Sequence, residues 1–482
     1  MNILPYELLV DVFHHLKEKR IPYDVTKFMK IIKLFLKCNT EIIFHGQYYE
    51  YINLRHLNVI GADLRLDFVK SNTQVNMEYL ESDKLLYLKL NTNRSQISHS
   101  GQIHKLVPNL KYLNTNFNMN NNYPKNLKIL TMKNDCIIQN TVINLKLQIK
   151  DNVRLPSYLK YLNTGLTTKL DFMRQTIVTL IINKSYQSEI NIWPCGLKKL
   201  KINNKYEYII RNLPDTISKL ILSNEFKGQV TDWPKQLTHL IVNKRVFLQT
   251  KTPIKLIFFG INGIDDSGAL LRYYPENVIQ MVLKTNVRVY CQIPLSVTKL
   301  TISEDYVMNN KILNLHQLKL THLIICDTGY YENNLSMINS MTTLTHLSII
   351  ISCDIPQLPI NLTHLKCNNF DQTHVYHITC LDETKLIYLD IMKTRLLPAT
   401  LKNLKVGYYY NATLPESLEK LWIRIEHHVL YLPQRLTHFV YTETFGTEIP
   451  KLPDSLIYVK ILHEYYSHIP KSVKFAVLIG KI

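Results

Sequence analysis

An internal repeat is the feature that most restricts how this 482-residue chain can fold. In each unit an apolar residue, here called the anchor, is followed by apolar residues three and five positions later, as in Leu197, Leu200 and Ile202. The first unit is read at Leu54, Leu57 and Val59. There are about 22 such units, with an average spacing of roughly 19 residues from Leu110 onward, which is typical of a solenoid repeat. Because one such unit cannot bury its apolar face alone, the sequence predicts stacked turns.

Proline fixes the register of the repeat. Most of the 19 prolines lie three residues before an anchor; examples are Pro194, Pro214, Pro234, Pro294, Pro398, Pro415, Pro433 and Pro453. Proline fixes φ and forces the preceding residue into an extended conformation, so it can lead a connector into a strand. That preceding residue is usually apolar, and each turn therefore offers about four inward positions. Unrelated strands in a sandwich are the alternative interpretation, which the fixed period disfavours.

The short repeat leaves little room for a returning helix. We therefore expect most connectors on the convex side to be extended or 3₁₀-like. The longer units Leu320–Leu344 and Leu362–Leu386 have room for one helical turn or a loop. The predicted fold class is α+β, with a short N-terminal helical segment (residues 1–45) followed by a parallel-strand solenoid (residues 46–482). At ~4.8 Å per strand, the array would extend on the order of 100 Å along its sheet.

Several segments carry a more specific pattern around the proline. They are IPLSVTKL at Ile293–Leu300, LPESLEKL at Leu414–Leu421, LPDSL at Leu452–Leu456 and IPKSV at Ile469–Val473. These segments resemble the FNIP or IPxxL class of leucine-rich repeats, known from slime moulds and giant viruses of amoebae. The resemblance covers residues 51–482, although the Phe-Asn pair of that class is mostly missing. A diverged FNIP member and a plain leucine-rich array remain the two alternatives, and both imply the same solenoid.

The N-terminal segment has helical periodicity instead of the repeat. Pro5 stands at a helix start with Glu7 in the first turn, and the apolar residues Leu8, Val12 and Leu16 share one face. The segment resembles the opening of an F-box at Leu4, Pro5, Glu7, Leu8, Val12 and Leu16. The resemblance implies that these residues bind a Skp-type adaptor and its cullin complex, so that the repeats present a substrate to a ubiquitin ligase. A helix that only caps the end of the solenoid is the alternative.

Residues two and four positions after each anchor should face outward on the concave side of the sheet, because side chains alternate along a strand. The predicted partner-binding residues on this face are Lys199, Lys201, Lys219, His239, Lys299, His322, His346, His364, Tyr388 and Trp422. Cations among aromatic rings favour an acidic peptide or protein, and single-stranded nucleic acid is a less favoured partner. A solvated strand face in a lysine-rich chain is the alternative to any binding role.

Charge and hydropathy bear on the partner and the compartment. The formal net charge of +19 favours acidic surfaces of any kind. The first residues lack the basic and apolar regions of a signal peptide, and no stretch reaches the ~18 apolar residues that would span a bilayer. We therefore expect no membrane partner and a cytoplasmic location, in the host cell if the chain is viral.

Metal and catalytic sites are not indicated. The eight cysteines are scattered without a CxxC pair. His322, His346 and His364 occupy equivalent places in three consecutive turns, where they would stack ~4.8 Å apart. No carboxylate or thiol shares their column, so we expect stacked neutral imidazoles without a metal ion. Since GxSxG, P-loop, HExxH and GxGxxG motifs are also absent, the sequence predicts a non-catalytic protein with no cofactor.

Overall fold

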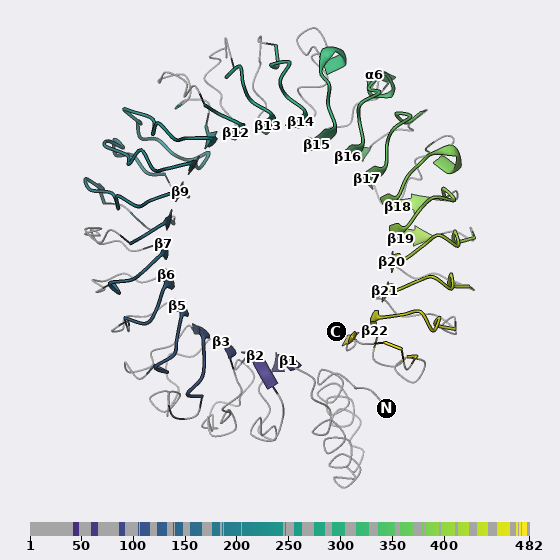
Figure 1. Cartoon of the computed structure of the whole chain (residues 1–482), viewed down its shortest axis with the longest axis horizontal. Helices are drawn as coiled ribbons and strands as arrows, with labels where there is room; N and C mark the ends of the chain where they lie inside the picture. Colours follow the sequence, from purple (N-terminus) through teal and green to yellow (C-terminus); the bar gives the residue numbers. More distant parts are fainter. Residues whose placement is uncertain are drawn as a thin grey trace. The chain divides into compact units, whose positions relative to one another are not determined.

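The computed structural model describes residues 42–47, 59–65 and 86–91, and most of residues 105–479 outside parts of the connectors. The chain divides between Pro253 and Ile254 into two compact units. Strands β1 to β11 belong to the first unit and β12 to β23 to the second. In each unit the strands line the concave side and the connectors lie on the convex side (Figure 1). Each unit is thus a parallel β-solenoid of about eleven turns.

The strands of the first unit are short and regularly spaced. They are β1 (Ile42–Gln47), β2 (Val59–Arg65), β3 (Tyr87–Asn91), β4 (Tyr112–Thr115), β5 (Ile129–Met132), β6 (Asn144–Leu147), β7 (Tyr161–Thr164), β8 (Thr179–Ile182), β9 (Lys199–Ile202), β10 (Lys219–Leu222) and β11 (His239–Val242). From β4 onward they are only four residues long, because the extended segment in each turn covers two inward positions.

The strands of the second unit are more variable in length. They are β12 (Phe258–Asn262), β13 (Gln280–Lys284), β14 (Lys299–Ser303), β15 (His322–Cys326), β16 (His346–Ile351), β17 (His364–Asn369), β18 (Tyr388–Thr394), β19 (Asn403–Tyr409), β20 (Lys420–Ile423), β21 (His438–Tyr441), β22 (Tyr458–Leu462) and β23 (Phe475–Ile479). Helix α6 (Ser336–Asn339) and the 3₁₀ turns η4 (Leu315–Gln317) and η5 (Leu381–Glu383) lie between them.

In β9, β10 and β11, parallel pairing without register shifts stacks equivalent positions of successive repeats. Leu220 of β10 lies between Leu200 of β9 and Leu240 of β11. All three leucines are fully buried, whereas the residues directly before and after each leucine on its strand are half-buried. The predicted alternation of inward and outward positions is therefore confirmed in these strands.

The interior holds more buried positions per turn than the four predicted. The aromatic residues four positions after β8, β9 and β10 form an additional row, in which Tyr186, Tyr206 and Phe226 are buried. Their rings stack with centroids 6.4 and 6.1 Å apart. Ile210 and Val230 form a further buried row and pair as an isolated bridge. The extra rows enlarge the apolar surface that each turn shares with its neighbours.

A hydroxyl residue directly before the anchor ties successive turns together. The Thr216 hydroxyl reaches the carbonyl oxygens of Cys195 and Leu197, both at 2.9 Å, in the preceding turn. Equivalent bonds are made by Thr176, Ser296, Thr343, Thr400, Ser417 and Ser455. In the same turn the amide of Ile217 donates to the carbonyl of Pro214 at 3.1 Å. The Pro-x-Ser/Thr-apolar pattern thus combines a tight turn with an inter-repeat hydrogen bond.

The start of the array differs from the predicted register. Strand β2 pairs Ala62 with Leu88 and Leu64 with Leu90, so the reading at Leu54, Leu57 and Val59 is wrong. The segment that begins at Val59 also has apolar residues at the required spacing, and its Val-Ile start favours an extended strand.

The predicted boundary at residue 45 falls inside a strand. Strand β1 (Ile42–Gln47) already pairs in parallel with β2. Residues 1–41, with the F-box-like positions Leu4, Pro5, Glu7, Leu8, Val12 and Leu16, lie outside the described residues.

The connectors are almost free of helix where the structure describes them. Helix α6 lies in the Leu320–Leu344 unit and η5 lies in the Leu362–Leu386 unit, which confirms the expected helical turns.

Among the described residues, no helix is both long and apolar enough to cross a membrane.

Candidate protein-binding face

We call the concave side of each sheet, formed by residues two and four positions after each anchor, the open face. Its first position in β9, β10 and β11 is occupied by Lys199, Lys219 and His239, which are aligned on neighbouring strands. The second position holds Lys201, which aligns with Ile221 of β10. These side chains are half-buried rather than covered by another element.

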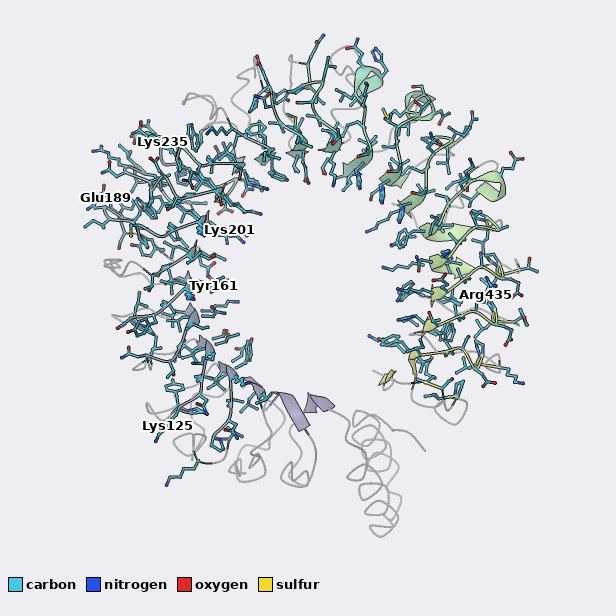
Figure 2. All side chains as sticks on the ribbon, viewed as in Figure 1. Lys125, Tyr161, Glu189, Lys201, Lys235 and Arg435 are labelled. Carbon is cyan, nitrogen blue, oxygen red and sulfur yellow. The ribbon has the colours of Figure 1, made fainter. Side chains whose placement is uncertain are left out.

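Lys199, Lys201 and Lys219 form what we call the lysine patch. Lys199 and Lys219 lie on neighbouring strands, ~4.8 Å apart in backbone spacing, and Lys201 is two residues from Lys199 on the same side of its strand. Figure 2 shows Lys201 and Tyr161 on the concave side of the first unit, whereas Glu189 and Lys235 project on the connector side. Three lysines thus share one part of the open face.

Acidic residues near the lysine patch lie on the connectors instead. Glu207 pairs with Lys227 at 3.0 Å, and Asp215 pairs with Lys235 at 2.9 Å. The hydrogen bond from Lys235 lowers the pKa of the Asp215 carboxyl. In these positions each carboxylate is compensated by a lysine of the next turn. On the open face, β9, β10 and β11 place no carboxylate beside the lysine patch.

A second column crosses the open face of the second unit. Lys299, His322, His346, His364 and Tyr388 are aligned on the five strands from β14 to β18. The imidazole centroids of successive histidines are 4.1 Å apart with interplanar angles of 9° and 11°. The Tyr388 ring continues the stack at 5.8 Å. The predicted alignment of the three histidines is confirmed, and we call these three residues the His column.

A threonine precedes each histidine of the His column and lies within hydrogen-bond distance of its Nδ1. The Thr345 hydroxyl lies 3.0 Å from the Thr321 carbonyl oxygen and 2.9 Å from Nδ1 of His346. The carbonyl can only accept, so we assign the hydroxyl hydrogen to it, and in this assignment the hydroxyl accepts from Nδ1–H. Equivalent pairs are Thr238–His239, Thr321–His322, Thr363–His364 and Thr437–His438. In each neutral imidazole, Nε2 then carries the lone pair.

The histidines of the open face contribute little positive charge near neutral pH. The pKa of His346 is lowered to about 4. Burial is the main cause, and the positive charges of His364, His322 and Lys299 act in the same direction. The pKa values of His322 and His364 are also lowered, mainly by burial. Burial and Lys219 lower the pKa of His239. The histidines predicted to help bind acidic groups are therefore neutral hydrogen-bonding residues at neutral pH.

An aromatic and charged cluster follows the His column on β18 to β20. The Lys405 ammonium lies 5.9 Å from the centroid of the Tyr388 ring and 5.1 Å from that of Trp422. Asp390 aligns with Lys405 and is 3% exposed, although it lies at an outward position. Its charge adds to the effect of burial in raising the pKa of the Cys367 thiol. Lys405 and Asp390 were not among the predicted site residues. In the sequence, only their outward positions in the repeat point to the open face.

The structure therefore groups the predicted residues in three places. The lysine patch and His239 lie together in the first unit, and Lys299, the His column and Tyr388 lie together in the second. Trp422 lies on β20 in the second-position column, where it neighbours Lys405. Across the described part of the chain, no group of three or more His, Cys, Asp or Glu side chains is arranged to hold a metal ion.

Comparisons with known proteins identify similar folds only. No protein-family model matches the sequence, and no curated protein matches it. Among solved structures, CroV588, described as a circular LRR protein, is 19% identical over 92% of this chain and 73% of its own length, with a TM-score of 0.41. YopM from Yersinia enterocolitica is 14% identical over 98% of this chain and 100% of its own, with a TM-score of 0.33. The PEPR1–AtPEP1 structure is 14% identical over 87% and 75%, with a TM-score of 0.32.

Proposed function

We propose that this chain is a non-catalytic protein-interaction protein that binds an acidic segment of a target protein on its open face. The observation that supports this most directly is the lysine patch, where Lys199, Lys201 and Lys219 lie on the same face of neighbouring strands and β9 to β11 carry no carboxylate. A rigid sheet holds the ammonium groups at fixed spacing, so a partner with matching carboxylates loses little entropy in aligning them.

The location of the charges favours the open face over the connectors as the binding surface. Connector lysines such as Lys227 and Lys235 are already paired with carboxylates of adjacent turns. A partner must compete with those carboxylates there, whereas the lysine patch offers charge that the sheet itself does not neutralise.

A finer proposal concerns the role of the interaction. We propose that the chain is the substrate-recognition subunit of a Skp–cullin–F-box ubiquitin ligase in the cytoplasm. Its support is the F-box-like sequence at Leu4, Pro5, Glu7, Leu8, Val12 and Leu16. In this role the N-terminal segment binds the adaptor and the open face binds the target. A repeat scaffold without the ubiquitin link is the outcome if the adaptor does not bind.

Charge reversal of the lysine patch tests the binding role. Lys199→Glu, Lys201→Glu and Lys219→Glu together should abolish binding of polyglutamate to the full chain, measured by fluorescence anisotropy. Lys205→Glu, an exposed connector position next to β9, is the matched control and should bind as the wild type does. Equal losses in both proteins would mean that only net charge matters. Tighter, more salt-dependent binding of single-stranded RNA than of polyglutamate would favour a nucleic-acid partner.

The adaptor role is tested separately. The full chain should retain a purified Skp-type adaptor in a pull-down, and Leu4→Ala with Pro5→Ala should lose it without a change in melting temperature. A double mutant that melts early, from a parent chain that never retains the adaptor, would instead assign residues 1–45 to a cap of the solenoid.

A further inference from the structure

The five Thr–His pairs on the open face present a repeated chemical group. In the assignment made above, the threonine hydroxyl of each pair donates to a backbone carbonyl of the preceding turn and accepts a hydrogen bond from Nδ1–H of the histidine. Nε2 is consequently an acceptor, and it is the ring nitrogen not used by the threonine. In the half-buried side chains of His322, His346 and His364 the ring faces are occupied by stacking and Nδ1 by the threonine, so Nε2 is the remaining polar atom of each ring.

The His column brings three of these acceptors together. His322, His346 and His364 lie on adjacent strands, and their stacking keeps the three rings nearly parallel. Parallel rings 4.1 Å apart cannot direct two lone pairs at one metal ion, since a shared ion would have to lie out of both ring planes. The column is better suited to separate hydrogen bonds, one from each strand.

The surroundings determine which donors fit. Lys299 precedes the column on β14, and Lys366 lies on β17 beside it, so a cationic donor is repelled. Tyr388 and Asp390 follow on β18, but Asp390 is buried. In the second-position column, Ile324 of β15 is 40% exposed and Ser348 of β16 is half-buried. The neighbourhood is thus polar and partly apolar, with lysines at its edges.

We infer that the open face from β15 to β17 binds a partner segment through uncharged hydrogen-bond donors, such as hydroxyl and amide side chains, which donate to Nε2 of His322, His346 and His364. This inference rests on the proposed function, because it assumes that the open face is the binding surface. The inference assigns a different partner chemistry to each part of that surface. Carboxylates of the partner bind at the lysine patch, and uncharged donors of the partner bind at the His column. The lowered pKa values keep the acceptors unprotonated at neutral pH.

The pH dependence of binding has opposite signs for the two chemistries. Protonation of Nε2 removes the acceptor, so acid should weaken the binding of a neutral donor. The other charged or titratable groups that face the column are Lys299, Lys366, Tyr388 and Asp390. An acidic segment, by contrast, should bind more tightly as the column gains positive charge.

The test uses the full chain and an array of three sets of synthetic peptides, enriched in Ser, Thr, Asn and Gln, in Asp and Glu, or in Lys and Arg. Donor-rich peptides should bind at neutral pH and weaken on acidification. His346→Phe keeps a stacked ring without Nε2, and it should lower their affinity about tenfold, as expected for the loss of a buried hydrogen bond. Thr345→Val keeps the imidazole of His346 but removes the hydroxyl that bonds to its Nδ1. The proton can then move to Nε2, so this variant should also weaken binding. His438→Phe, which alters the equivalent Thr–His pair outside the column, is the control and should have no effect.

Direct observation of the tautomer completes the test. In ¹⁵N NMR of histidine-labelled full chain, the column should show a protonated Nδ1 and an unprotonated Nε2 at neutral pH. Protonated Nε2 atoms, or donor-rich peptides that bind no better to the wild type than to His346→Phe, would overturn the inference. If acidic peptides still bind and depend on the lysine patch, the proposed function survives that result. If no peptide set binds, both proposals fail.

Discussion

Truncation of one buried leucine gives the sharpest test of the solenoid core. Leu220 is fully buried on β10, between Leu200 and Leu240 of the adjacent strands. Its neighbour Ile221 lies on the same strand but points to the open face and is half-buried. Leu220→Ala and Ile221→Ala remove the same number of carbon atoms, so the pair isolates the effect of facing the interior.

The expected magnitudes follow from burial. Loss of three buried carbon atoms at Leu220 costs about 2.4 kcal/mol in transfer free energy, and the remaining cavity raises the total to about 3–4 kcal/mol. The same truncation at Ile221 should cost about 1 kcal/mol, because much of that side chain already contacts water. Each turn is stabilised mainly by its two neighbours, so the damage should spread to β9 and β11 rather than to the whole chain.

Hydrogen exchange followed by mass spectrometry measures this directly. Peptides that contain β9, β10 and β11 should lose protection in Leu220→Ala and keep most of it in Ile221→Ala, and urea unfolding should show the same order. If the two variants exchanged at equal rates, or if Ile221→Ala were the more damaging, the assignment of inward and outward positions would be refuted.

Three further predictions follow from specific contacts. Thr216→Val should lower the free energy of unfolding by about 1–3 kcal/mol in urea titrations, because the carbonyls of Cys195 and Leu197 lose the one hydroxyl donor they share, whereas Thr216→Ser should be close to wild type. Gly228→Ala should lower the melting temperature, with a cost of about 1–3 kcal/mol, since the added methyl group would collide with the Tyr208 carbonyl oxygen; a wild-type melting temperature would contradict this contact. The depressed pKa of His346 means that the unfolded chain binds the proton first, so stability should fall as pH drops from 6.5 toward about 4. His346→Phe should show a shallower loss over that window, and identical pH profiles for both proteins would exclude this contribution.

The sequence predicted the solenoid well because the repeat encodes its own contacts. The anchor at Leu197 and the apolar residues Leu200 and Ile202 are buried as expected, since a fixed spacing allows only one stacked arrangement. The spacing did not reveal the aromatic row of Tyr206 and Phe226, which lies beyond the strand in a connector of variable sequence. It also misplaced the first repeat, where two overlapping segments satisfy the pattern.

The chemistry of the site was less predictable than its position. The outward columns were identified from alternation, and the alignment of the His column followed from the period. The charge state of the histidines did not follow, because it depends on burial and on the threonine hydroxyls. Asp390 was missed for the same reason, since its burial among its neighbours on the open face is a property of the packed sheet.

The proposed binding surface can be tested by a photo-cross-linker at one position. A benzophenone side chain at Ile221 would lie on the open face beside Lys201, whereas the same group at Glu207 would lie on an exposed connector of the same unit. With polyglutamate as the probe, the full chain should form cross-links from position 221, and these should diminish as salt is raised. Cross-links from position 207 alone, or none from position 221, would contradict the conclusion that the open face is the binding surface.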